Sequence, residues 1–248
     1  GTFTYGTSTL VMAKSGTQFM YGVNLFDVNN LTINSGSTTK IETINDSGGE
    51  LQIHGILTAT GTLTSGTTAA NSKIAMQTGG TTIAVGSAAN SLSGLFSVEL
   101  EHSSGTTTLP TCTLKRLMCK TSGLTALANG DLTLTEELEV NSGTTFNANG
   151  NTIDVDILDV NGGTLDMRNS DFIMQSGGAV AWHDTSSTIL SGNTTLTGHS
   201  SANKTDTYVP AAGNYEIVGD VKFLKLDAGA SDNFDLTVVG AVIDCDVS

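Results

Sequence analysis

Three aspartates lie close together near the middle of the chain, at a spacing that could support chemistry. Asp154 and Asp156 alternate with aliphatic residues over 153–157, a pattern typical of a strand with one buried face, and Asp159 follows. On an extended strand, alternate carboxylates share one face about 6–7 Å apart. Two carboxylates at that separation could serve a glycosidase or hold Ca²⁺.

The residues around these aspartates weaken an enzymatic reading. Asp166 and Asp171 follow one partial repeat later, and Arg168 is the only basic residue nearby. A polysaccharide lyase generally needs a Lys or Arg base beside its metal, so this region offers little for that chemistry. A solvated outer face that supplies solubility explains the carboxylates more simply. We therefore predict a non-catalytic chain with no metal site and no cofactor.

Cysteine and histidine form no ligand or nucleophile pattern. Cys112, Cys119 and Cys245 allow at most one internal disulfide. Cys112 and Cys119 are seven residues apart, so on an extended strand they would face opposite sides, and the pair spacing of zinc sites is absent. We predict small, buried apolar side chains. No zinc-binding or protease frame connects the four histidines, which are His54, His102, His183 and His199.

The most distinctive aromatic cluster is Trp182 with its neighbours His183 and Asp184, in a chain with only 5% aromatic residues. Sugar-binding surfaces often combine an exposed aromatic ring with polar groups, whereas a Trp in the core is the structural alternative. These three residues are the candidate glycan contact.

A short repeated phrase organises the chain. It consists of an apolar residue, Asn or Gln, a small residue, Gly, and then Thr or another small residue, and its copies begin at Ile33, Met76, Val140, Val160 and Met174. Asn and Gly tolerate positive φ and turn the chain, while Thr and aliphatic residues favour extended backbone. Val140 and Val160 are 20 residues apart, and Leu31 and Leu51 open similar strands at the same spacing.

A unit of about 20 residues with two or three short strands cannot bury its own apolar face, but stacked copies can. The sequence therefore predicts an all-β parallel β-helix, or β-solenoid, with a C-terminal cap or small β module. A β-sandwich stays open as the alternative, because it also uses many short strands and frequent turns. Short helical turns are expected at 92–102 and 114–120, the second containing the only basic apolar patch.

The repeats suggest three regions. Residues 1–24 are predicted to be N-terminal strands or a cap, residues 25–197 the repetitive solenoid, and residues 205–248 a C-terminal β cap or contact module. The last region follows a polar bridge and has denser, less repetitive strands. Solenoid ends need such atypical caps to cover exposed strand edges.

Charge narrows the classes of partner. Asp and Glu total 24 against 10 Lys and Arg, a formal charge of −14, which repels phosphate backbones and makes the chain a poor candidate for nucleic-acid binding.

No apolar run reaches the ~18 residues needed to span a membrane. The chain opens with strand-like alternation and no signal peptide, so we expect a removed leader, export by another route such as lysis, or part of a longer polypeptide.

The phrase at 30–36 and its relatives over residues 25–195 resemble Thr/Asn/Gly-rich repeats of bacteriophage tail-fibre and other virion structural proteins, and of bacterial surface adhesins. The resemblance implies a structural or attachment role and often a trimer, and it transfers no site residues.

We therefore expect a structural subunit of a virion or extracellular appendage, such as a fibre, sheath or surface layer. It would self-associate into a homo-oligomer or filament through strand edges and end modules, at a virion or cell surface. The alternative is a secreted adhesin that binds cell-surface glycans. A β-helical enzyme that degrades polysaccharides is a third hypothesis.

Overall fold

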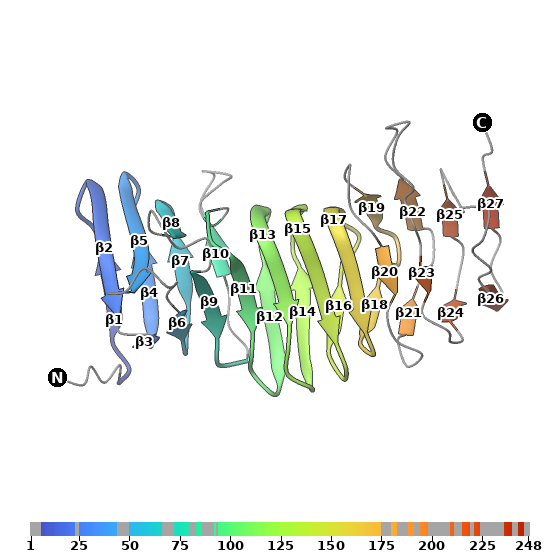
Figure 1. Ribbon diagram of the computed structural model, residues 1–248, viewed down its shortest axis with the longest axis horizontal. Coiled ribbons are helices and arrows are strands. Elements are labelled where there is room, and N and C mark those ends of the chain that lie inside the picture. Colours follow the sequence, from blue (N-terminus) through green and yellow to red (C-terminus); the bar gives the residue numbers. More distant parts are fainter. Residues whose placement is uncertain are drawn as a thin grey trace.

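The protein is a stack of short parallel strands, seen in a computed structural model that describes residues 6–22, 25–43, 50–65, 72–79, 83–85, 92 and 94–174, and the strands β20 to β27 beyond them. In Figure 1 the strands follow one another along the long axis, from the N-terminal end to the C-terminal end. Every pairing between named strands is parallel. The predicted parallel β-solenoid is confirmed, and the β-sandwich alternative is wrong.

Four sheets run along the stack. Sheet A contains β1 (Thr9–Met12), β4 (Asn30–Ile33), β7 (Leu57–Ala59) and β10 (Ile83–Val85). Sheet B contains β2 (Gly16–Gly22), β5 (Ser37–Thr43) and β8 (Thr62–Ser65). Sheet D contains β12 (Gly105–Leu109), β14 (Leu124–Ala128), β16 (Thr145–Asn147), β18 (Thr164–Asp166), β21 (Thr188–Leu190), β24 (Tyr215–Val218) and β26 (Leu236–Val239).

Sheet C extends along the whole stack and has 13 strands. Its main path contains β3 (Leu25–Val28), β6 (Glu50–Ile53), β9 (Lys73–Met76), β11 (Ser97–Leu100), β13 (Cys112–Cys119), β15 (Leu132–Asn141), β17 (Thr152–Asn161), β19 (Asp171–Met174), β22 (Thr194–Thr197), β25 (Val221–Phe223) and β27 (Ile243–Cys245). Two further strands, β20 (Val180–Trp182) and β23 (Val209–Pro210), pair beside this path.

The course of the chain changes partway along the stack. The first coils visit sheets A, B and C in turn, whereas from β12 onward the chain alternates between D and C. The long strands β13, β15 and β17 make this possible because each covers two sides of its coil. The register shifts between Leu114 and Arg116 and between Leu134 and Glu137, and β17 pairs with β19 through its first half and with β20 through its second.

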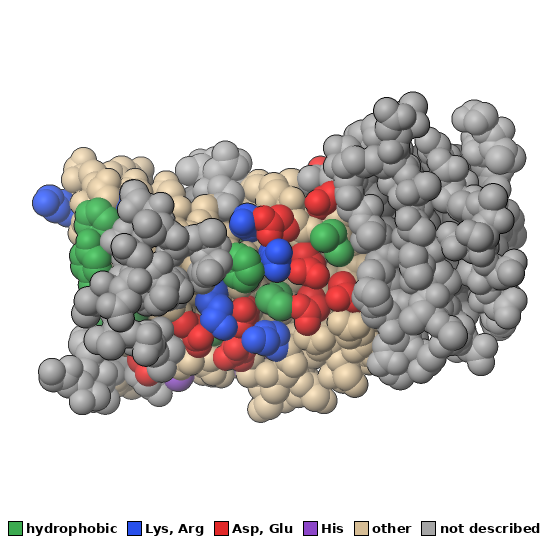
Figure 2. All heavy atoms as spheres, viewed as in Figure 1, with side chains coloured by type: hydrophobic (Ala, Val, Ile, Leu, Met, Phe, Trp, Pro, Cys, Tyr) green, Lys and Arg blue, Asp and Glu red, His purple; other side chains and the backbone are tan. Residues whose placement is uncertain are grey.

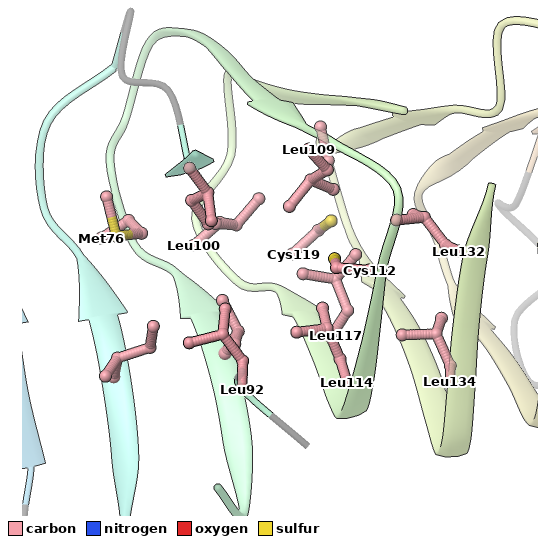
Figure 3. Close-up of a cluster of buried hydrophobic side chains, with 14 of the residues drawn as sticks. Met76, Leu92, Leu100, Leu109, Cys112, Leu114, Leu117, Cys119, Leu132 and Leu134 are labelled. Atoms are coloured by element: carbon pink, nitrogen blue, oxygen red, sulfur yellow. The ribbon is translucent and has the colours of Figure 1, made fainter. Parts of the chain in front are cut away.

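The core is a continuous column of aliphatic ladders. Leu117, Leu138 and Leu158 occupy equivalent positions in successive coils and are fully buried, as are the large rings of Phe146 and Phe172. Figure 3 shows part of this column, with leucines from β13 and β15 turned toward the interior. Burying each such side chain contributes roughly 1.5–3 kcal/mol, and no single coil could do so alone.

The repeated phrase forms corners, as predicted, in the copies at Ile33, Val140 and Val160, whereas parts of the copies at Met76 and Met174 lie outside the described residues. In the copy at Val140, the backbone N–H of Thr144 donates to the carbonyl of Asn141 at 3.0 Å, which closes the turn after β15. Val140 and Asn141 pair in register with Val160 and Asn161, so the 20-residue spacing is confirmed there.

The prediction that Leu31 and Leu51 occupy equivalent positions 20 residues apart is wrong. Leu31 lies in sheet A, opposite Leu57, whereas Leu51 lies in sheet C opposite Ile74. The two leucines therefore belong to different sides of the solenoid, because all sides share one alternation of apolar and polar residues.

The expected helical turns are also wrong. Ser97–Leu100 is strand β11, and residues 114–119 belong to strand β13. Just before β11, the backbone N–H of Leu95 donates a hydrogen bond to the carbonyl of Leu92 at 3.1 Å.

Strand pairing crosses both predicted region boundaries. At the N-terminus, β1 pairs with β4 and β2 with β5, and toward the C-terminus β24 pairs with β21 and β25 with β22. The described strands of residues 205–248 thus extend the sheets of the solenoid, and a capping role for this region stays a prediction. Among the described residues no helix is long and apolar enough to cross a bilayer.

Candidate functional site

The outward side of sheet C carries a concentration of charged side chains, which we call the charged face: the outward residues of β6, β9, β11, β13, β15 and β17. Figure 2 shows Lys, Arg, Asp and Glu gathered over the middle of the molecule. Alternation places them there, because every second residue of these strands points away from the core. The face has two parts, one ion-paired and one acidic.

Glu99 is the centre of the ion-paired part. Its carboxylate lies 2.9 Å from the Nζ of Lys73 and 2.8 Å from that of Lys120, although its side chain is only 5% exposed. Glu50 and Glu101 extend the chain of pairs at 3.2 and 3.5 Å. These pairs therefore join β6, β9 and β11 to one another, and to Lys120 directly after β13, across the outer surface.

The protonation of this cluster follows from its geometry. Burial alone raises the pKa of Glu99, but the hydrogen bonds and positive charges of Lys120 and Lys73 outweigh burial and hold its pKa below the usual range. Burial lowers the pKa of Lys73, yet bonding to Glu99 and Glu50 leaves that pKa raised. Glu99, Lys73 and Lys120 are thus ionised at neutral pH.

A second ionic group lies where β13 and β15 bend. Glu136 accepts from Lys115 Nζ and Arg116 Nε, both at 2.6 Å, and Arg116 also lies 3.4 Å from Glu137. The guanidinium of Arg116 stacks 4.6 Å from the centre of the Phe96 ring. The basic apolar patch predicted at 114–118 is therefore engaged with neighbouring coils.

The acidic part of the charged face lies on β15 and β17. Glu139 and Asp159 are opposite one another in register, and like charges in that position repel. Burial, together with Glu139, Asp159 and Glu136, raises the pKa of Glu137 despite the opposing charge of Arg116.

The aspartates singled out from the sequence lie on this surface but form no catalytic pair with a base. Asp154 and Asp156 are half-buried on β17, and Asp154 aligns with Thr133 and Ile173 on the adjacent strands. Arg168, the basic residue that follows these aspartates in the sequence, instead binds Asp166 through Nε at 2.8 Å and Nη2 at 2.6 Å. In the described part of the chain no three His, Cys, Asp or Glu side chains are placed to hold a metal ion.

Both described histidines are held by local partners. His54 lies 3.2 Å from Asp27, and His102 is bonded to the carbonyl of Ser104 and the hydroxyl of Thr107 at 2.9 and 2.8 Å. Burial lowers the pKa of His102. His183 and His199 lie outside the described residues.

Cys112 and Cys119 are free and buried, which confirms their predicted apolar role. The prediction that they face opposite sides is wrong, because the register shift in β13 turns both inward (Figure 3). Burial raises the pKa of each thiol to about 12. Cys245 ends β27, and its side chain lies outside the described residues.

The predicted glycan contact lies largely outside the described residues. Trp182 ends β20 opposite Pro210 of β23, and its side chain lies outside the described residues, as do His183 and Asp184. The sequence analysis missed a different aromatic group, on β2. Phe19 and Tyr21 stack with ring centres 5.4 Å apart and are 45% and 56% exposed, and Lys40 lies 5.9 Å from the Phe19 ring. Their i, i+2 spacing within an alternating segment was the available signal.

No protein family, curated protein or solved structure matches this chain significantly.

Proposed function

We propose that the chain is a non-catalytic structural subunit of a virion or extracellular appendage, a rod that assembles with further copies through its strand edges and ends. One observation carries the proposal: the parallel stack is continuous from β1 to β27, with one sheet along its whole length. Such an architecture converts sequence length into axial length, which is what a fibre or sheath subunit needs.

The internal energetics support the same role. A column of buried aliphatic residues runs through successive coils, and ion pairs join neighbouring strands on the outside. Each coil is stabilised by its neighbours, so the rod resists bending and local opening along its length.

The experiment combines size measurement with imaging. The purified chain is examined by sedimentation and by electron microscopy of negatively stained particles, in the absence of any ligand. Oligomers or filaments of uniform width support the proposal. A chain that stays monomeric at every concentration tested, including the highest soluble one, contradicts it.

Glycan binding is the second candidate function, and the exposed stack of Phe19 and Tyr21 favours it. Flat aromatic rings at the surface offer apolar faces to sugar C–H groups, and Lys40 lies opposite Phe19 on the adjacent strand. Replacing both rings by Ala should then abolish retention on immobilised polysaccharide. Val11→Ala is the control, since Val11 is similarly exposed on β1. Equal retention of all three proteins would reject this function.

A further inference from the structure

Charge is distributed very unevenly around the solenoid. We call the outward side of sheets A and D, from β1 to β21, the neutral face. Asp166 is the only charged residue within the described strands β1, β4, β7, β10, β12, β14, β16, β18 and β21. Asp166 is itself buried and bound to Arg168. By contrast, each strand of sheet C from β3 to β19 carries at least one charged residue.

Threonine lines the neutral face in a regular row. Five threonines from successive coils pair in register and alternate with buried residues, so their side chains point outward; they are Thr106, Thr125, Thr145, Thr164 and Thr188. Thr32 and Thr58 form a shorter row on sheet A, next to the exposed Val11. Most turn residues beside the D strands are also uncharged, as at 103–105, 121–123, 142–144 and 149–151. Lys120 and Asp131 adjoin two of the turns next to β14, and the exposed Arg168 lies in the turn after β18.

The net charge of the chain favours the neutral face as the surface through which two copies can meet. Each copy carries a formal charge of −14, so two copies that approach side by side through acidic surfaces repel one another. The acidic part of the charged face cannot be neutralised by a second copy, because most basic side chains on that face are already ion-paired. Contact through the neutral face keeps the acidic surfaces of the two copies farther apart, which lessens their repulsion, and it leaves the ion pairs of the charged face in water.

The neutral face is large enough for a stable contact. β10 contacts β12, so sheets A and D follow one another along the axis. With strands about 4.8 Å apart and about 3.3 Å per residue, the nine strands span roughly 40 Å, and strands with their turns span roughly 20 Å. The product, about 800 Å², equals the area that each partner of a typical stable complex buries, about 800 Å².

We infer that copies of this chain associate side by side through the neutral face, with the threonine rows of two copies packed against each other. The regular parallel rows suit such packing, since facing sheets interdigitate their side chains at a separation of about 10 Å. The inference rests on the proposed structural function and adds to it a lateral surface, distinct from the strand edges and ends.

The test introduces like charges into the centre of the proposed contact. In the double variant Thr125→Glu with Thr145→Glu, the carboxylates occupy adjacent positions on sheet D. The matched control is Thr38→Glu with Thr62→Glu, an equally spaced pair of half-buried, outward threonines on sheet B. Both doubles add the same charge, and thermal unfolding checks that both fold. Association is measured by sedimentation equilibrium over a range of concentrations.

The expected result is a loss of about 100-fold in the association constant for the sheet D double, because like charges meet across the contact, and little change for the sheet B double. The inference is overturned if the wild type associates and the sheet D double associates equally well, or if both doubles lose association equally; the proposed structural function then stands. A wild type that never associates overturns both. If that monomer binds polysaccharide and the sheet D double does not, the face binds glycans instead of a second copy.

Discussion

Glu99 shows how a single residue couples the outer surface of the solenoid to pH. Lys120 and Lys73 keep the pKa of this carboxyl below its usual range, so the unfolded chain takes up the proton more readily than the folded one. The stabilisation from Glu99 is therefore complete above the unfolded pKa of about 4.3 and is lost as the pH falls through the folded pKa.

We expect Glu99→Gln to lower the free energy of unfolding at pH 7 by about 1–3 kcal/mol, since two lysines lose a buried partner. The difference from the wild type should shrink toward pH 3, which urea unfolding at the two pH values measures. Glu101→Gln is the control, because Glu101 is more exposed and its Lys120 contact is longer, at 3.5 Å. A constant difference at both pH values would contradict the assigned role.

Glu137 should behave in the opposite way. Burial and the neighbouring carboxylates raise its pKa, so ionisation of this group opposes folding at neutral pH, and stability gained by protonation appears as the pH falls through the raised pKa. Glu137→Gln should thus raise the free energy of unfolding at pH 7 slightly, by about 0.5 kcal/mol. A clear destabilisation in the same urea assay would show that its contact with Arg116 dominates.

The two buried thiols should be chemically silent in the folded protein. With a pKa of about 12, Cys112 and Cys119 stay protonated at pH 8, and burial also blocks access. Iodoacetamide should therefore leave both unmodified in the native protein and modify both in denaturant, as peptide mass spectrometry detects. Rapid labelling of either residue in the native protein would refute its burial.

At the scale of the element, the corner before β14 depends on a close approach between coils. Gly123 has a φ of 96°, and a Cβ there would collide with the carbonyl oxygen of Ser103. Gly16 has a similar φ of 90° but open space around it. Gly123→Ala should lower the midpoint of thermal unfolding more than Gly16→Ala, which suffers only backbone strain of about 1 kcal/mol. Equal effects would mean that neighbouring coils separate easily.

How well the sequence predicted these elements depended on whether the alternation was regular. Where apolar and polar residues alternate regularly, as in residues 132–134 and 153–155, the strands and their buried residues could be predicted from the sequence. The bend in β13 led to a wrong prediction of helical turns. Leu114 and Leu117 both face inward although they are three residues apart, and that spacing is typical of a helix. The same bend reversed the expected direction of Cys119.

The charged face was predictable only in part. Acidic residues on the outer side of β17 followed from alternation, but the pairs of Glu99 with Lys73 and Lys120 join residues 26 and 21 positions apart. Such contacts depend on coil lengths, which differ between the two halves of the chain. Ile74 pairs with Leu51, 23 positions away, and Leu138 with Leu158, 20 away. No single repeat length could therefore have predicted from the sequence which charged residues pair.

For the whole molecule, stability should spread from coil to coil. Phe146 is fully buried on β16, between β14 and β18, and Phe146→Ala should cost about 3–5 kcal/mol. Because coils interact chiefly with their neighbours, the loss should fall with distance along the axis. Amide hydrogen exchange should accelerate most in β12 to β18 and least in β2 and β5. Uniform acceleration would instead indicate a single cooperative unit.

The matched registers of β13, β15 and β17 have an evolutionary consequence. A duplicate of residues 124–143 placed after position 143 would find, above and below, surfaces that already fit it, since Leu134 meets Leu114 on one side and Val155 on the other. Each such duplication would lengthen the molecule by about 4.8 Å. Genes for proteins of this design can therefore lengthen the solenoid by one coil at a time, while the coils at its two ends stay unchanged.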